Sequence, residues 1–149
     1  AYTNAIKFLD EWDDGSTPSE WGPDTVFVLD SMTLLGRACF NWAKGMNPTA
    51  KDPRQWYGQA QESLLAVIDL LTSPDFHSHV IVISHIDIVE QADGTTKGFA
   101  SSIGKALGPK IPATFNTMLL AESRGTGENV KRTITLGDGM ATVFKTLLA

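Results

Sequence analysis

Two short apolar runs, each followed at once by polar residues, constrain the fold of this chain more than any other feature of its sequence. The first run covers residues 25–29 and ends at Asp30, and the second covers residues 80–83 and ends at Ser84 and His85. Continuous apolar runs of this length indicate strands that are buried on both faces, as in parallel sheets. Ligands bind at the carboxyl ends of such strands, so Asp30 and His85 are the first candidate site residues.

Helical patterns around these runs indicate the fold class. Apolar residues recur at helical spacing over residues 2–12 and more clearly over 56–71, where Leu64, Ile68 and Leu71 belong to one stripe. Strands separated by a helix favour a parallel sheet with helices packed on its faces. The sequence therefore predicts an α/β fold.

The remaining segments are less regular. The pattern over residues 31–42 is mixed, and residues 44–53 and 91–112 are expected to be loops. The second of these loops is rich in Gly and Lys, and loops of that length are often functional or mobile. Residues 115–121 predict a third strand, and the Gly-rich residues 125–129 predict a hairpin turn to a partner strand over 130–136.

Composition limits the class of protein. The chain has 149 residues, 42% of them apolar and 19% charged, which fits one soluble globular domain. Its apolar runs are far shorter than the about 20 residues that span a bilayer, so we expect no membrane partner. The single cysteine, Cys39, excludes an internal disulfide framework and fits a reducing compartment, so we expect a cytoplasmic location.

Charge is distributed unevenly along the chain. The net charge is −5, and acidic residues crowd positions 10–24. Residues 94–121 contain no acid but include Lys97, Lys105 and Lys110, and further basic residues follow at positions 124, 131 and 132. An acidic chain of this kind can present one basic face to a polyanion.

Each candidate site residue has a structural alternative. Asp30 suits a hydrated Mg²⁺, which prefers one or two carboxylates together with phosphate oxygens, but it could equally cap the following helix. Ser31 could order the water shell of that ion or act as a second N-cap. His85 could donate a hydrogen bond to a terminal phosphate or bond a neighbouring carbonyl. For Asp30 and His85, the local pattern alone favours the structural role.

The stretch from residue 97 to 110 has the composition of a nucleic-acid-binding segment. Glycines allow the chain to approach phosphates, and Lys97, Lys105 and Lys110 would neutralise them. Phe99 could stack on a base. A solvated flexible loop explains the same composition about equally well.

The order of these pieces resembles the second half of the RecA-like P-loop ATPase core. The similarity lies in "VFVLDSMTLLGRACFNWA", "VIVISHID" and "GPKIPATFNTMLLAESRG", and it covers nearly the whole chain. More narrowly, the chain is similar to the single-domain RecA-like ATPases of tailed phages, which are nucleotide-binding or single-strand-annealing recombination proteins. This resemblance implies a mostly parallel sheet flanked by helices, with a C-terminal β-hairpin. Residues 1–149 would then be one partial ATPase domain.

The resemblance also implies a role for each site residue. Asp30 would be the Walker B aspartate, which holds Mg²⁺ through water beside Ser31, and His85 would be the γ-phosphate sensor. Residues 37–51, with Arg37 and Lys44, would form a first DNA-binding loop, and residues 97–110 would form a second. The cations that would reach the phosphates of a neighbouring subunit are Arg124, Lys131 and Arg132.

These roles imply ATP and Mg²⁺ as cofactors. The implied partners are single-stranded DNA and further copies of the chain in a ring or filament. The implied location is the host-cell cytoplasm, if the protein is encoded by a phage.

One motif of the resembled family is missing. The phosphate-binding loop ends in Gly-Lys-Ser/Thr, and Gly104-Lys105-Ala106 lacks both the glycine spacing and the hydroxyl. We therefore expect a chain truncated at its N-terminus, whose intact parent is the ATPase and which does not hydrolyse ATP alone. The alternatives are a nucleotide-independent DNA-binding or interaction module and a fragment of a hexameric helicase core.

Overall fold

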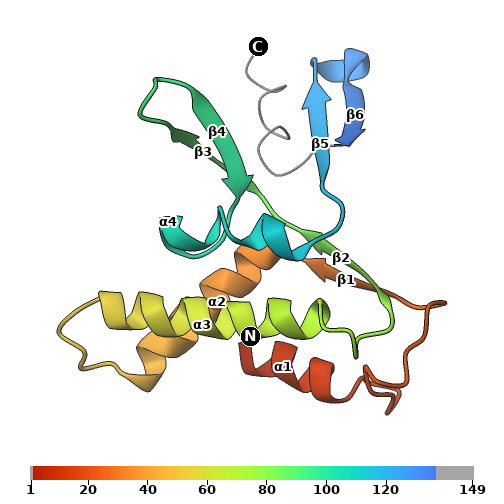
Figure 1. The fold of residues 1–149 in the computed structure, drawn as a ribbon, viewed down its shortest axis with the longest axis vertical. Helices are drawn as coiled ribbons and strands as arrows, with labels where there is room; N and C mark the ends of the chain where they lie inside the picture. The colour runs from red at the N-terminus through yellow and green to blue at the C-terminus, as the bar shows by residue number, and fades with distance from the viewer. Residues whose placement is uncertain (1, 137–149) are drawn as a thin grey trace.

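The computed structural model describes residues 2–136, apart from the side chains of Thr96 and Lys105. Helices and one strand pair occupy one half of the molecule, and two strand hairpins project from it (Figure 1). The elements in chain order are α1 (Tyr2–Asp10), β1 (Val26–Asp30), α2 (Met32–Met46), α3 (Arg54–Leu71), β2 (His79–Ile83), β3 (Ile86–Glu90), β4 (Thr96–Ala100), α4 (Gly104–Leu107), η1 (Ile111–Thr114), β5 (Leu119–Arg124), η2 (Gly127–Asn129) and β6 (Lys131–Leu136).

The two apolar runs form a parallel strand pair, as predicted. β1 pairs with β2 in a register that places Val28 opposite Ile81 and Asp30 opposite Ile83. Phe27 and Leu29 on the inner face pack against the core. Val28 and Ile81 on the outer face are each 51% exposed. The expectation that both faces are buried is therefore wrong for the described part of the chain.

Helices α2 and α3 form the centre of the core. The pattern over residues 31–42 looked mixed because α2 is in contact with α3 on one side and with α1 on another. The Tyr2 and Trp42 rings, for example, lie 4.9 Å apart between α1 and α2. The buried side chains of α2 and α3 are those of Met32, Leu35, Cys39, Ala43, Ala60, Leu64, Val67, Ile68 and Leu71.

The predicted C-terminal hairpin is confirmed. β5 and β6 pair antiparallel around the turn over residues 125–129, with Leu119 opposite Leu136 and Arg124 opposite Lys131. Gly125 has φ +99°, and an added Cβ there would overlap the Asn129 carbonyl. Glycine is therefore required at this position of the turn.

A second hairpin replaces the predicted loop over residues 91–112, so that prediction is wrong. β3 and β4 pair antiparallel, and α4 and η1 follow them. The turn is closed by the Gln91 N–H, which donates to the Thr95 carbonyl at 2.7 Å, and it contains Asp93-Gly94 with Gly94 at φ +76°. Asp-Gly is a hairpin signal, but Gly98 weakens the strand pattern that follows it.

Two of the three described strand pairs are thus antiparallel, and each pair forms its own two-stranded sheet. The α/β class is confirmed, whereas the mostly parallel sheet is not found among residues 2–136. None of the helices in that range is both long enough and apolar enough to cross a membrane.

Candidate functional site

The carboxyl ends of β1 and β2 lie side by side. Because Asp30 is paired in parallel register with Ile83, the residues that follow the two strands leave the pair together. We call this group, made of Asp30, Ser31, Ser84 and His85, the strand-end edge. The Asp30 and His85 side chains are both exposed there, so the structure brings the two predicted catalytic residues to one edge. The Asp30–Ser31 peptide bond is cis.

Ser31 is the N-cap of α2. Its hydroxyl oxygen accepts a hydrogen bond from the Leu34 N–H at 3.3 Å, and the residue is only 4% exposed. This hydrogen bond satisfies one of the free N–H groups in the first turn of the helix. Asp30 therefore is not the cap, and its carboxylate remains at the exposed edge.

Hydrogen bonds with Thr33 and Ser101 hold the main chain of His85 in place. Its N–H donates to Thr33 Oγ1 at 3.0 Å, and its carbonyl accepts from the Ser101 N–H at 2.7 Å. The Thr33 hydroxyl in turn donates to the Ser101 carbonyl at 3.0 Å. We call these three hydrogen bonds the Thr33 bridge. Sequence reasoning missed Thr33 and Ser101, because they lie 68 residues apart and no local pattern connects them.

The predicted first DNA-binding loop is mostly helix, so its loop conformation is wrong, while its DNA-binding role stays a prediction. α2 continues to Met46, which places Arg37 and Lys44 on a helix and leaves only residues 47–53 as a connection. Both side chains are exposed. The Lys44 ammonium lies 5.6 Å from the centre of the Trp56 ring, within the range of a cation–π contact.

The predicted second DNA-binding segment is ordered as well. Lys97 and Phe99 lie on β4, two positions apart, so they share one face of the β3–β4 hairpin. Lys110 is exposed just before η1, whereas the Lys105 side chain lies outside the described residues.

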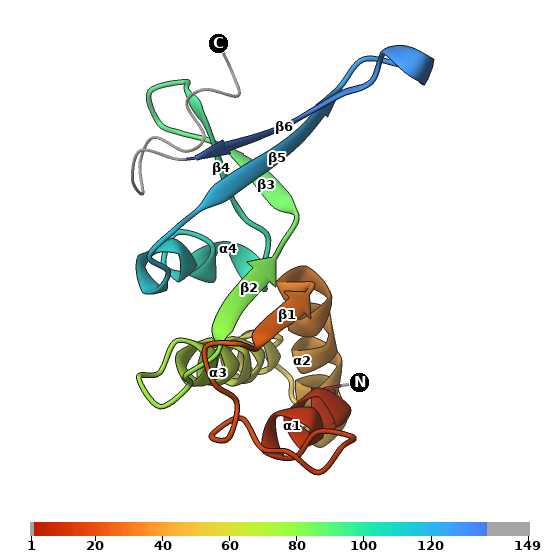
Figure 2. The same ribbon diagram turned by 90° about the vertical axis from the view of Figure 1, so that its right-hand side faces the viewer.

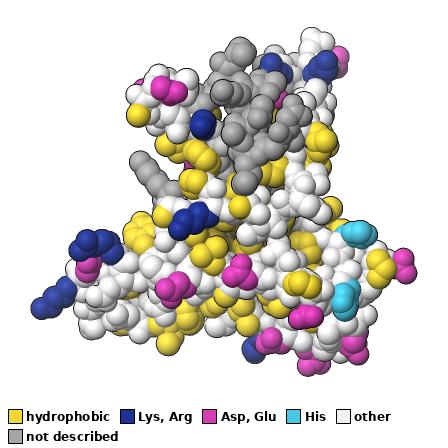
Figure 3. Space-filling view, in the orientation of Figure 1, with side chains coloured by type: hydrophobic (Ala, Val, Ile, Leu, Met, Phe, Trp, Pro, Cys, Tyr) yellow, Lys and Arg dark blue, Asp and Glu magenta, His cyan; other side chains and the backbone are white. Residues whose placement is uncertain are grey.

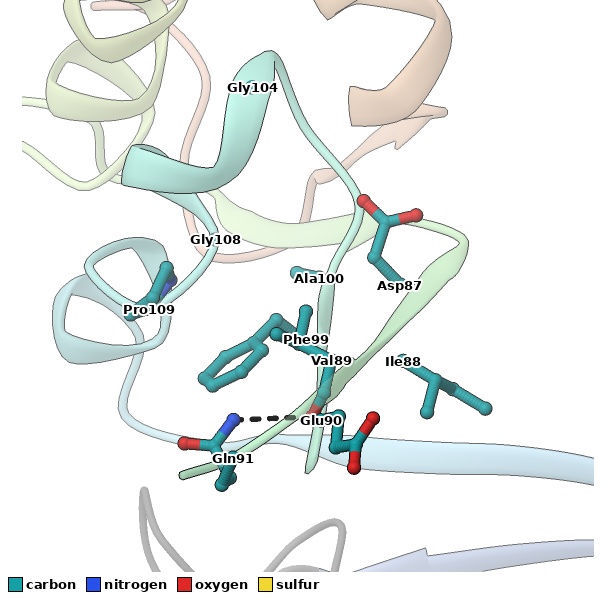
Figure 4. Close-up of a pocket in the computed structure, with 10 residues that line it drawn as sticks. All are labelled: Asp87, Ile88, Val89, Glu90, Gln91, Phe99, Ala100, Gly104, Gly108 and Pro109. Carbon is teal, nitrogen blue, oxygen red and sulfur yellow. Dashed lines mark hydrogen bonds between the residues drawn. The ribbon is translucent and has the colours of Figure 1, made fainter. Parts of the chain in front are cut away.

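A cleft of about 710 Å³ lies between the β3–β4 hairpin and the segment after β4 (Figure 4). Asp87 and Glu90 contribute carboxylates to its lining, and no basic residue is among the ten lining residues. A phosphate backbone does not suit such a lining. The two carboxylates point in different directions in Figure 4 and do not form a joint cation site. Residues 2–136 likewise contain no group of three His, Cys, Asp or Glu side chains that could hold a metal ion.

The cations that were predicted to reach the phosphates of a neighbouring subunit cluster near the tip of the β5–β6 hairpin. Arg124, Lys131 and Arg132 are exposed there, and the Arg124 guanidinium lies 3.1 Å from the Glu122 carboxylate. Two views place this tip far from the ends of β1 and β2 (Figures 1 and 2). Within one chain, these cations are therefore not brought together with Asp30 and His85.

Basic side chains do not form one continuous face on the side of the molecule that Figure 3 shows. They gather at the connection between α2 and α3 and again at the tip of the β5–β6 hairpin. Acidic side chains lie along the lower border in this view. On this side the basic side chains therefore form separate groups.

Comparisons with known proteins identify the family. A family model described as an AAA domain matches residues 1–146. Searches of curated proteins and of solved structures gave no match. The match covers nearly the whole chain, and the α/β fold with its strand-end edge is compatible with it. The chain therefore belongs to the AAA domain family, whose members are ATPase-like nucleotide-binding proteins that generally use ATP and Mg²⁺.

Proposed function

We propose that the strand-end edge is the Mg²⁺ and terminal-phosphate part of an ATP site of the RecA-like type. The parallel register of β1 and β2 carries the proposal, because it sets Asp30 and His85 at adjacent strand ends. This is where ligands bind in parallel α/β sheets.

Three residues of the edge have distinct tasks in this site. The exposed Asp30 carboxylate would hold Mg²⁺ through its water shell, and the His85 ring would donate a hydrogen bond to the terminal phosphate. Ser31 keeps its hydroxyl on the Leu34 N–H and so fixes where α2 begins beside Asp30. Since residues 1–149 contain no Gly-Lys-Ser/Thr loop, the phosphate-binding loop has to come from another segment or another copy.

We further propose that nucleotide binding is coupled to single-stranded DNA. The exposed Lys110 and the β4 residues Lys97 and Phe99 would contact the DNA backbone and bases, together with Lys105, Arg37 and Lys44. The support is the exposure of Lys110, Arg37 and Lys44 and the attachment of β4 to the edge through Ser101. Arg124, Lys131 and Arg132 would act on the phosphates of a neighbouring copy, because they lie far from the edge of their own chain.

The Asp30→Asn variant tests the ATP site. In the intact protein, we expect it to lose Mg²⁺-dependent ATP binding and hydrolysis by at least about tenfold, because the neutral amide no longer attracts the hydrated ion. Asp69→Asn, which removes an exposed acid from α3, is the matched control and should behave as the unmodified protein. Equal MgATP affinity in both variants, measured by calorimetry with and without EDTA, would contradict the proposal.

A nucleotide-independent DNA-binding module is the second candidate function. The missing Gly-Lys-Ser/Thr motif favours it. In that case, residues 1–149 alone should bind a single-stranded oligonucleotide with an affinity that falls with salt and does not respond to MgATP. Replacement of Lys97, Lys105 and Lys110 by Ala should abolish this binding, and unchanged binding would remove the candidate.

A further inference from the structure

We infer that Thr33 is a positioning residue that sets the orientation of the β3–β4 hairpin relative to the strand-end edge. Thr33 is the second residue of α2 and is half-buried. Its hydroxyl accepts from the His85 N–H and donates to the Ser101 carbonyl, both at 3.0 Å.

The two residues that Thr33 contacts are the two ends of the hairpin. His85 directly precedes β3, and Ser101 directly follows β4. The Ser101 N–H also donates to the His85 carbonyl at 2.7 Å, next to the Ile86–Ala100 pair of the ladder. The Thr33 bridge therefore continues the hairpin ladder by one pair and fastens that pair to the start of α2.

The chain beyond Ser101 is fixed from two further directions. Ile103 is 5% exposed, and its carbonyl accepts from Gln61 Nε2 of α3 at 2.9 Å. The Ile103 side chain packs closely on Gly36 of α2. A Cβ added to Gly36 would lie 2.9 Å from Ile103 Cγ1. Because this segment cannot shift freely, the base of the hairpin moves only if the Thr33 bonds change.

The Thr33 bridge gives a specific route by which nucleotide binding at the edge could affect the DNA contacts. This route rests on the proposed function. A phosphate bound at His85 would shift the main chain of that residue, and the Thr33 hydroxyl would pass the shift to Ser101 and β4. β4 carries Lys97 and Phe99, so the proposed DNA contacts would move with it. The imidazole is needed only to contact the phosphate, because beyond His85 the route runs through main-chain groups and one hydroxyl.

Hydrogen exchange followed by mass spectrometry tests the bridge without nucleotide. Thr33→Val keeps the shape of the side chain but removes both hydrogen bonds, so the amides of residues 86–100 should exchange several-fold faster. Thr33→Ser keeps the hydroxyl and should restore slow exchange, and His85→Ala keeps the main-chain bonds and should also leave it slow. Residues 54–71 of α3 report whether any variant is globally unfolded.

Equal exchange of residues 86–100 in Thr33→Val and in the unmodified protein would overturn the inference. If Thr33→Val unfolds globally, slow hairpin exchange in Thr33→Ser together with fast exchange in Thr33→Gly supports the bridge, and slow exchange in both overturns it. A separate measurement adds MgATP. It should alter the exchange rates of residues 86–100 in the unmodified protein and in Thr33→Ser. If MgATP does not bind the unmodified protein, the ATP site fails, while the nucleotide-free arm still decides the role of Thr33.

Discussion

The two halves of the molecule differ in how they bury apolar side chains. Residues 2–83 supply most of the core, and Leu64 and Ile68 of α3 are 0% exposed. The two hairpins beyond residue 83 leave large apolar side chains open, with Ile88 at 65% and Ile134 at 71% exposed. Regions with few buried apolar contacts open most easily, and binding segments are commonly drawn from them. The helical half therefore supplies most of the buried contacts, and we expect the hairpins to open more easily.

Truncation of one core residue and one hairpin residue should give the largest contrast between the halves. Leu64→Ala removes fully buried methyl groups and should lower the free energy of unfolding by about 2–5 kcal/mol. Ile134→Ala removes a mostly exposed side chain and should change it by less than about 0.5 kcal/mol. Urea unfolding followed by circular dichroism measures both values. Similar losses in the two variants would show that the hairpin is as tightly packed as the core.

Two glycines on the helices provide a smaller and more local contrast. Gly36→Ala places a Cβ 2.9 Å from Ile103 Cγ1 and should destabilise the protein by about 1–3 kcal/mol, because the anchored segment has to move. Gly58→Ala on α3 meets nothing within 4 Å and should stabilise the helix by up to about 1 kcal/mol. Opposite signs in thermal unfolding are expected, and a stabilising Gly36→Ala would mean that Ile103 is not fixed.

The effect expected to be smallest near neutral pH is a pH response of the buried core. Burial raises the pKa of the Cys39 thiol from 9.0 to about 11. Between these pH values the folded state keeps the proton and the unfolded state loses it, so the free energy of unfolding falls as pH rises, by about 1.4 kcal/mol for each pH unit in this range.

Cys39→Ala should lack this component, and the difference between the two pH profiles isolates it from the titration of Lys and Tyr. In the β3–β4 hairpin, by contrast, hydrogen bonds from Thr95 lower the pKa of Asp93. The contribution of the ionised Asp93 to the free energy of unfolding is therefore lost at acid pH, as the pH falls through that lowered pKa. A pH profile of Cys39→Ala that matched the unmodified protein above pH 9 would contradict burial of the thiol.

Local patterns predicted the elements that local residues determine. The runs that end at Asp30 and His85 formed the parallel pair, and the Gly-rich turn formed the β5–β6 hairpin. The β3–β4 hairpin was missed because Gly98 interrupts its strand, although Asp93-Gly94 marked the turn.

Other features depend on residues far apart in the sequence and could not be predicted from it. The outer face of β1 and β2 also carries large apolar residues, so the sequence could not show which face the helices would cover. These four residues are Val26, Val28, Ile81 and Ile83. The Thr33 bridge requires three segments that only the folded chain brings together. For the candidate site, the sequence predicted the positions of Asp30 and His85 but not the hydroxyl that holds the His85 main chain.

The Thr33 bridge also has a consequence that we expect for the order of folding. The two hydrogen bonds that Thr33 itself makes span 52 and 68 residues, whereas α2 and α3 are neighbours in the chain and can dock early. Contacts that close long loops incur the loop-closure entropy before they gain any bonding energy, and they slow folding. We therefore expect a helical intermediate in which α2 and α3 are already packed while the β3–β4 hairpin is not yet fastened to them. The residue that positions the hairpin in the native protein would then mark the last step of its folding.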